Sequence, residues 1–443
     1  MNVKKSMHRR EFLKVSTLGA VGAGIPAHKV ISSSTVGRTQ TTTDELKIKE
    51  YRKLGRTGFK VSDISAGEHQ GNEAILSTLL DAGVNYIDTG ESYGRGRDER
   101  VIGQVVKKRD RKSVFITTKL YLNKDRTKNS IIERTRKCLE RLQTDYIDCM
   151  MIHSAQSVAT IKGKGFHDAM SELKIEGRVR FVGISNHGTH WGILPPEESM
   201  EKILLAAAED GRFDVMLLVY NYLAKENGEK VLKVCAEKNI GTTLMKTNPV
   251  ADYLFFKSEV EQLEKEGKDI PGYLKRVLLR YEKLVEEAQG FIKKHNLKDT
   301  HEIKDAAIRY ALNNPHVHTV CATCNNFEEA EAFLKLSGGR FTPQDKKTLT
   351  AYAQGCGIFY CRHACGLCEP SCPHHVPVNS IMRYNHYFVA QHREKHAMQK
   401  YSGLPTAKAD LCLNCEGQCE AACPFNVPIH ALLINAHKRL IFA

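Results

Sequence analysis

The alternation of strand-like and helix-like segments between about residues 60 and 340 is the feature that most constrains the fold. Short runs rich in β-branched residues alternate with amphipathic segments of helical period, such as Asn129–Leu142 and Phe166–Glu176. The eight strand-like runs are Val61–Ser65, Asn85–Thr89, Val114–Lys119, Tyr146–His153, Phe181–Ser185, Val215–Tyr220, Thr242–Lys246 and Val317–Ala322. Eight successive strand–helix units predict an α/β fold, a parallel (β/α)8 or TIM barrel. A doubly wound open sheet is the alternative, but the first run lacks the Gly-rich phosphate turn that such sheets carry.

The predicted barrel spans residues 49–342 and contains one long insertion at about 249–300. This segment is longer than an ordinary connection between a strand and a helix, and its apolar residues recur at helical spacing among charged ones. The sequence leaves open whether it is a solvated helical insertion or a lid over one mouth of the barrel.

Four polar residues fall at the ends of three successive predicted strands. These residues are Asp88, Tyr93, Lys119 and His153. Active sites of such barrels lie where the strands end, so we predict that the four side chains converge. An ammonium lowers the pKa of a neighbouring phenol, and a carboxylate holds the ammonium in place. We therefore predict that Tyr93 is a general acid for a carbonyl oxygen, although each residue alone also has an ordinary structural explanation.

The motifs around these residues resemble the aldo-keto reductase family over about residues 51–340. They are Asn85-Tyr86-Ile87-Asp88-Thr89 with Ser92-Tyr93-Gly94, Ile116-Thr117-Thr118-Lys119, and Gly183-Ile184-Ser185-Asn186. The resemblance implies a TIM barrel that binds NADP(H) or NAD(H). It also implies hydride transfer to or from a small carbonyl or alcohol substrate, with Tyr93 protonating the oxygen, Lys119 and Asp88 tuning it, and His153 orienting the substrate.

The same resemblance implies the candidate cofactor-binding residues. Ser185 and Asn186 would hold the nicotinamide carboxamide. Lys246 stands at the end of strand seven, where the family often has an aromatic residue, and Asn325 and Asn326 follow strand eight, where it usually has a basic one. Because residues 321–326 contain no Lys or Arg, the choice between NADP and NAD stays open.

Eight cysteines near the carboxyl end form two similar runs. The runs are Cys361-x3-Cys365-x2-Cys368-x3-Cys372-Pro373 and Cys412-x2-Cys415-x3-Cys419-x3-Cys423-Pro424. Crowding of thiols at one end of a large chain indicates metal binding rather than a disulfide scaffold. Zinc is the alternative to iron–sulfur, but a fourth cysteine followed by proline is typical of iron–sulfur runs.

The two runs resemble those of bacterial two-cluster ferredoxins, each being one residue longer. The resemblance implies a mostly helical domain at residues 343–443 with two [4Fe-4S] clusters, in which the fourth cysteine of each run serves the other cluster. Cluster one would take Cys361, Cys365, Cys368 and Cys423, and cluster two would take Cys412, Cys415, Cys419 and Cys372. Residues 376–402 are predicted to be a helical spacer, and His392-x3-His396 within them a solvated helix face.

The amino terminus resembles a twin-arginine export signal. Arg9-Arg10-Glu11-Phe12-Leu13-Lys14 precedes a short run rich in Gly and Ala, and a Ser/Thr-rich linker covers residues 31–48. The resemblance implies that residues 1–30 direct export of the folded protein to a bacterial periplasm. The alternative is a basic tail that contains a short helix.

The basic composition does not indicate nucleic-acid binding. The formal net charge is +14, and residues 1–60 supply 13 Lys and Arg against 4 acidic residues, or +9 of it. Nucleic-acid binding needs cations clustered on one folded face. No run of 18 apolar residues is present either, so we expect no membrane span in the mature chain.

These patterns together predict an exported oxidoreductase with a reductase barrel and an iron–sulfur domain. The clusters are either structural or pass electrons to a redox protein partner. The alternative function is a catalytically inactive barrel that carries the clusters for electron transfer.

Overall fold

The computed structural model describes residues 46–68, 72–122, 126–187, 198–223, 225–247, 263–270, 301–356, 360–363, 365–405 and 407–441. The export signal, nearly all of the linker and most of the insertion at about 249–300 therefore lie outside the described residues. Residues 43–443 belong to one compact unit.

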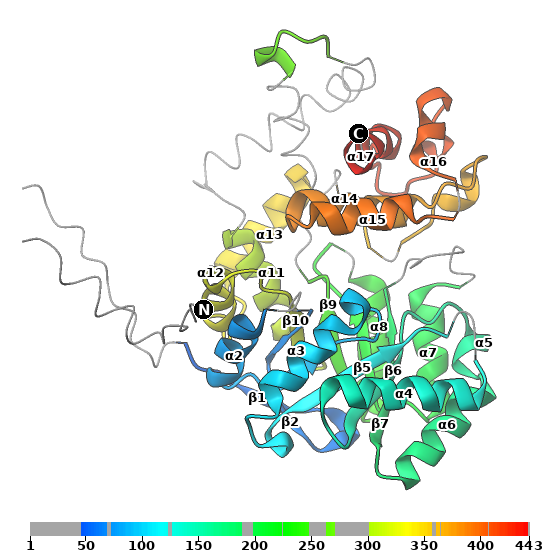
Figure 1. The fold of residues 1–443 in the computed structure, drawn as a ribbon. Coiled ribbons are helices and arrows are strands. Elements are labelled where there is room, and N and C mark those ends of the chain that lie inside the picture. Colours follow the sequence, from blue (N-terminus) through cyan, green and yellow to red (C-terminus); the bar gives the residue numbers. More distant parts are fainter. Residues whose placement is uncertain are drawn as a thin grey trace, which may run out of the picture. The chain divides into compact units, whose positions relative to one another are not determined.

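Eight parallel strands form a closed barrel, which confirms the predicted fold class (Figure 1). Around the barrel the strands follow chain order, and β10 closes it by pairing with β3. Their bounds are β3 Ile64–Ala66, β4 Tyr86–Asp88, β5 Phe115–Leu120, β6 Ile147–Ile152, β7 Val179–Asn186, β8 Val215–Val219, β9 Gly241–Met245 and β10 Thr319–Ala322.

The first predicted strand is divided into two elements at Asp63. Its first half, β2 (Lys60–Ser62), pairs with β1 (Tyr51–Lys53) in an antiparallel hairpin, and only β3 enters the barrel. The Asp63 carboxylate accepts hydrogen bonds from the Ser337 hydroxyl and the Gly338 backbone N–H, both at 2.7 Å. Contacts with residues so distant in sequence hold the chain at this point, and no local pattern encodes them.

Helices that bury one apolar face surround the barrel. The helix α4 (Lys128–Leu142) illustrates the local reasons, since the Thr127 hydroxyl accepts from the Ser130 N–H at its start and Ile131, Cys138 and Leu142 are buried. The other helices of this part are α2 Glu73–Asp81, α3 Arg97–Val106, α5 Val158–Ile161, α6 Lys164–Ile175, α7 Met200–Asp210, α8 Glu226–Glu237, α11 His301–Asn313 and α12 Phe327–Leu334.

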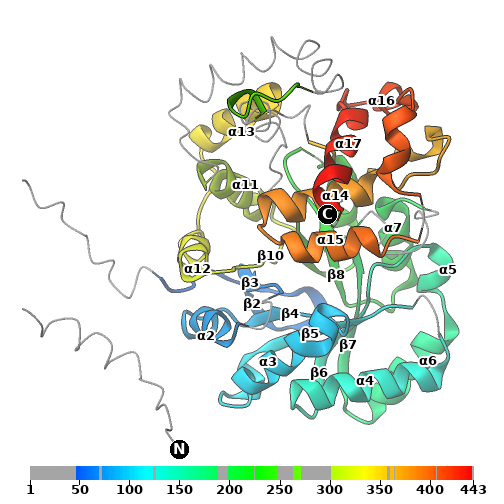
Figure 2. The same cartoon turned by 45° about the horizontal axis from the view of Figure 1, so that its top comes forward.

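The carboxyl-terminal segment is helical, as predicted. Its helices are α13 Pro343–Cys356, α14 Val378–Ala390, α15 Glu394–Ser402, α16 Gln418–Ala421 and α17 Ile429–Leu440. They build a second hydrophobic core that also takes in Leu223, Ile303 and Ala307 of the barrel part. Both views show α14 and α15 lying across one mouth of the barrel (Figures 1 and 2). Within the described ranges, no helix combines the length and the apolar character that crossing a membrane requires.

Candidate active site

The ends of three neighbouring strands bring the four predicted catalytic side chains to one mouth of the barrel. Asp88 ends β4, Lys119 is next to last in β5, and His153 directly follows β6. Tyr93 begins a short 3₁₀ helix after β4, and the loop that leads to it is tied to β5 by a hydrogen bond from the Glu91 N–H to the Lys119 carbonyl (3.1 Å). Parallel strands end at the same rim, which is why strand-end positions could be located from sequence.

The Lys119 ammonium lies at the centre of this group. Its Nζ donates to Asp88 Oδ2 and to the Thr89 carbonyl, both at 2.6 Å, and lies 3.5 Å from the Tyr93 hydroxyl. The Lys119 side chain is fully buried, and that of Asp88 is 6% exposed. A buried charge is stable only when it is paired, so Asp88 holds the ammonium beside Tyr93.

The Tyr93 hydroxyl is less acidic than the sequence suggests. Burial raises the pKa of Tyr93 well above its ordinary value, and the charges of Asp88 and Glu68 raise it further. The expected net lowering of this pKa is therefore not found in this structure, because desolvation of the phenolate is the largest cause of the shift. Tyr93 stays protonated at neutral pH, which is the form that can donate a proton.

His153 is held as a neutral imidazole beneath the same mouth. Burial lowers the pKa of His153 well below its ordinary value, and the charges of Lys119 and Lys400 lower it further. The ring stacks on Tyr121, with centroids 4.0 Å apart, and lies edge-on to Tyr93. Its Nδ1 is buried and has no hydrogen-bond partner among the described residues. Such an imidazole suits a neutral polar group of a ligand.

Two of the candidate cofactor residues direct their side chains into the barrel wall. The Ser185 hydroxyl accepts a hydrogen bond from the Ser154 N–H (3.0 Å), and the Asn186 amide donates to the Ala155 carbonyl (2.7 Å). Neither residue lines the cavity described below. Both residues lie at the predicted strand end, but the Ser185 hydroxyl and the Asn186 amide form hydrogen bonds with the segment that follows β6.

The two asparagines after β10 have different surroundings. Asn326 is the N-cap of α12, and its side chain accepts from the Glu329 N–H at 2.8 Å. Asn325 lines the cavity and also donates to the Glu329 carboxylate at 3.1 Å. Of this pair, only Asn325 is placed to meet a ligand.

Lys246 points into the cavity from a left-handed backbone conformation. Its φ is +57°, a value that is uncommon for residues other than glycine. Residues in such conformations occur more often at functional sites. The Nζ lies 2.6 Å from His187 Nδ1 and 2.9 Å from the Met245 sulfur. Burial lowers the pKa of Lys246 well below its ordinary value, and the nearby Arg383 charge adds to this.

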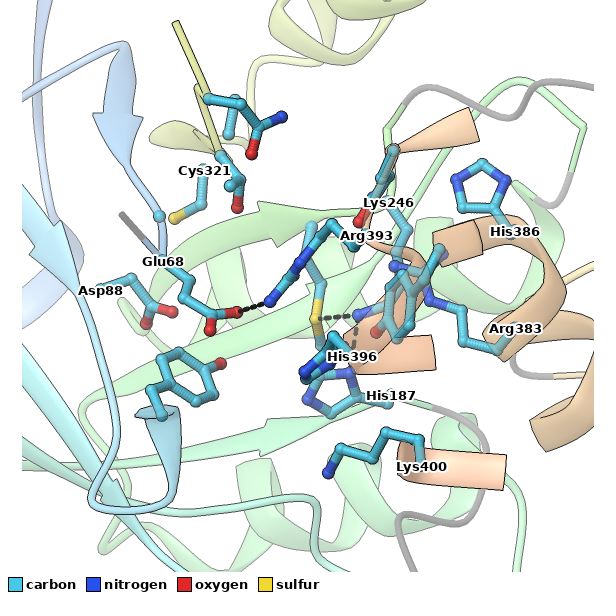
Figure 3. Close-up of a pocket in the computed structure, with 18 of the residues that line it drawn as sticks. Glu68, Asp88, His187, Lys246, Cys321, Arg383, His386, Arg393, His396 and Lys400 are labelled. Carbon is cyan, nitrogen blue, oxygen red and sulfur yellow. Dashed lines mark hydrogen bonds and ion pairs between the residues drawn. The ribbon is translucent and has the colours of Figure 1, made fainter. Parts of the chain in front are cut away.

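A cavity of about 760 Å³ lies above Tyr93 and is shared by the barrel and the carboxyl-terminal helices. The barrel lines it with Asp88, Tyr93 and Lys246, and α14 with the segment through α15 lines it with Arg383 and Lys400, among others (Figure 3). Helices outside the predicted barrel thus form part of the wall of the site.

Sequence reasoning missed this contribution of α14 and α15. Arg393, between the two helices, forms an ion pair with Glu68 after β3 at 2.9 Å, and their side chains are 8% and 17% exposed (Figure 3). His396 lines the cavity, and burial lowers its pKa to about 3, so its assignment to a solvated face is wrong. The helical period of residues 376–402 predicted that helices form in this segment, but it could not predict that they pack over the mouth of the barrel.

The eight cysteines of the two runs are free thiols. Burial raises the pKa of Cys361, and repulsion from Cys368, Cys365 and Cys423 raises it further. Burial raises the pKa of Cys412 to about 12, with added repulsion from Cys419, Cys372 and Cys415. Among the described residues, no three His, Cys, Asp or Glu side chains are placed to hold a single metal ion.

Several known proteins are similar to this chain. The chain is 25% identical over 326 residues to the aldo-keto reductase YhdN of Bacillus subtilis, covering 68% of this chain and 92% of that protein. It is also 25% identical to the uncharacterized oxidoreductase YqkF of the same organism, covering 68% and 96%. Among solved structures, the aldo-keto reductase AKR11C1 from Bacillus halodurans is similar at 20% identity and a TM-score of 0.48, covering 68% and 95%.

The family profile gives the most direct assignment. The profile of the aldo/keto reductase family matches residues 63–354, which is well over half of the chain. The barrel strands and the residues Asp88, Tyr93, Lys119 and His153 all lie inside this match. The chain therefore belongs to the aldo/keto reductase family.

Proposed function

We propose that this protein is an NAD(P)-dependent oxidoreductase that transfers a hydride to or from the carbonyl carbon of a small molecule. The observation that carries the proposal is the buried Lys119 ammonium, 2.6 Å from Asp88 and 3.5 Å from the Tyr93 hydroxyl, beneath a cavity that Asp88 and Tyr93 line. A polar site of this kind suits proton transfer to a substrate oxygen.

The cavity fits a nicotinamide dinucleotide in part. Lys246 and Asn325 line it and would hold the phosphate-bearing cofactor, whereas the Ser185 and Asn186 side chains are engaged in the barrel wall. A bound reduced nicotinamide supplies the hydride.

The residues of this chain supply the proton and the orientation. Tyr93 is protonated at neutral pH and donates its hydroxyl proton to the carbonyl oxygen as negative charge develops there. Lys119 stabilises the phenolate that remains, and Asp88 keeps Lys119 in place. His153 is neutral and buried beside Tyr93, and although it does not itself line the cavity, its role in this proposal is to orient the same oxygen.

Replacement of Tyr93 by phenylalanine tests this proposal. General acid catalysis contributes about 10²- to 10⁴-fold, so we expect Tyr93→Phe to lower kcat for NADPH-dependent aldehyde reduction by that factor. Tyr146→Phe is the matched control, because Tyr146 precedes β6 at the opposite end of the barrel. Full activity in Tyr93→Phe would refute the proposal and favour the alternative of an inactive barrel that carries electron-transfer clusters.

We also propose that the carboxyl-terminal segment binds two [4Fe-4S] clusters. The support is the proximity of thiols from both runs, since Cys423 acts on Cys361, Cys365 and Cys368, and Cys372 acts on Cys412 and Cys419. Cys368 also has Cys419 as its strongest cysteine neighbour, so the two sets lie side by side. This exchange of the fourth cysteine is the arrangement that a cubane cluster needs from two short runs. The Val376 and Gly417 N–H groups, 3.4 Å from the sulfurs of Cys372 and Cys415, fit hydrogen bonds to cluster thiolates.

Iron and sulfide analysis of anaerobically prepared protein tests the clusters. We expect about eight iron and eight sulfide per chain, because each cubane holds four of each. Cys423→Ser should remove cluster one, which otherwise depends on the first run. Cys235→Ser, in the barrel core, is the control and should change neither count. Iron-free wild-type protein would refute the proposal.

We further propose that residues 1–30 direct export by the twin-arginine pathway to the periplasm. The support is the Arg9-Arg10-Glu11-Phe12-Leu13-Lys14 motif alone.

A further inference from the structure

The charges that line the cavity are unbalanced. Six lysines and arginines face three carboxylates. Two of the carboxylates already have cationic partners, since Glu68 pairs with Arg393 and Asp88 with Lys119. The carboxylate of the third, Glu329, accepts hydrogen bonds from the Asn325 backbone N–H and side-chain amide at the start of α12. Among the described residues that line the cavity, cations therefore outnumber carboxylates, and a buried excess of positive charge favours an anionic ligand.

Arg383 on α14 is the most deeply buried of these cations. It is 6% exposed, and its Nε has no hydrogen-bond partner among the described residues. One guanidinium nitrogen lies 2.6 Å from His363 Nε2, and the guanidinium group lies 4.5 Å from the centre of the Tyr387 ring. These contacts position a planar donor group but leave its charge uncompensated. A guanidinium in this state matches the fork geometry of a carboxylate.

Lys400 on α15 lines the same cavity and places a second positive charge in it. Burial lowers the pKa of Lys400, and its charge acts on His153, which lies beside Tyr93. In the view of Figure 3, Arg383 and Lys400 lie on the opposite side of the Glu68–Arg393 pair from Asp88. The two cations thus belong to the part of the cavity formed by the carboxyl-terminal helices.

We propose that α14 and α15 form the part of the cavity wall that recognises the substrate, and that Arg383 and Lys400 select a carbonyl compound bearing a carboxylate or similar anionic group. This inference rests on the proposed function. Both residues lie outside residues 63–354, the segment that matches the reductase family and contains the candidate cofactor residues. The substrate is therefore the better source of the anionic group than the phosphates of the cofactor.

A pair of aldehydes that differ only in charge tests this assignment. The probes are 4-formylbenzoate and its neutral methyl ester, reduced by the full-length protein with NADPH. Hydrogen bonds to charged groups correspond to roughly ten- to hundredfold in affinity, so we expect that preference in kcat/KM for 4-formylbenzoate. Arg383→Met and Lys400→Met should each reduce the preference about tenfold, with the loss falling on the kcat/KM for 4-formylbenzoate rather than on that for the ester. Lys395→Met, an exposed cation on α15 outside the cavity, is the control.

Calorimetric titration of 4-formylbenzoate into the wild type and Arg383→Met without NADPH gives a readout independent of turnover. Equal reduction of both aldehydes, or binding unaffected by Arg383→Met, would overturn the inference while leaving the proposed function intact. An increased KM for NADPH in the variants would assign the cations to the cofactor and also overturn it. If neither aldehyde is reduced but 4-formylbenzoate binds in an Arg383-dependent way, anion recognition stands and the proposed reductase function fails.

Discussion

Removal of the Lys119 ammonium should destabilise the protein far more than removal of a surface lysine that makes an equally short ion pair. Lys119 Nζ is 2.6 Å from Asp88, and both side chains are buried. At an effective dielectric constant of about 20, two charges at this separation attract by about 6 kcal/mol, and desolvation opposes this. Truncation of one partner in such a buried pair leaves the other uncompensated and costs about 3–5 kcal/mol, which is the loss we expect for Lys119→Met.

The matched control is Lys137→Met. Lys137 lies 2.5 Å from Glu133 on α4, but the side chains are 56% and 67% exposed, so water replaces the lost partner and we expect no measurable change. The assay is denaturant unfolding followed by far-UV circular dichroism under anaerobic conditions.

A double variant and the pH dependence separate the ion pair from loss of packing. Asp88→Asn added to Lys119→Met removes the uncompensated charge and should restore more than half of the lost stability. Burial already raises the pKa of Asp88, and Lys119 opposes that rise, so the single variant raises the pKa further. When the pKa of a carboxyl group is higher in the folded state than in the unfolded state, the free energy of unfolding decreases as pH rises. The loss of stability in Lys119→Met should therefore be larger at about pH 8 than at about pH 5. Equal losses for Lys119→Met and Lys137→Met, or no recovery in the double variant, would refute this reasoning.

The surroundings of two further residues and the amino-terminal motif give three more predictions. Because burial lowers the pKa of His153 well below its unfolded value, protonation below pH 6.5 favours the unfolded state. The free energy of unfolding of the wild type, measured by denaturation at a series of pH values, should therefore fall more steeply below pH 6.5 than that of His153→Asn, with a slope that corresponds to about one additional proton bound on unfolding. Arg393→Met leaves Glu68 without its partner beside the cavity, so limited proteolysis should cut around α14 and α15 faster than in the wild type, whereas an unchanged rate would mean that the ion pair does not hold the helices. Replacement of Arg9 and Arg10 by lysine should retain the protein in the cytoplasm on cell fractionation, and unaffected export would exclude the twin-arginine assignment.

The sequence alone predicted the barrel and the location of the four catalytic candidates, because both depend on local patterns. Alternating strand and helix periods define each element, and closure of parallel strands necessarily brings their carboxyl ends together. Asp88, Lys119 and His153 could be recognised because each ends or follows a strand.

The tertiary structure decided the properties that depend on burial and on contacts between distant segments. It turned the Ser185 and Asn186 side chains toward the chain after β6, and it raised the pKa of Tyr93 where its lysine neighbour alone would lower it. It also placed α14 and α15 over the catalytic mouth, joined to it by a pair between Glu68 and Arg393, 325 positions apart. Helical period shows that such helices form, but the surface they cover depends on long-range packing that no local pattern records.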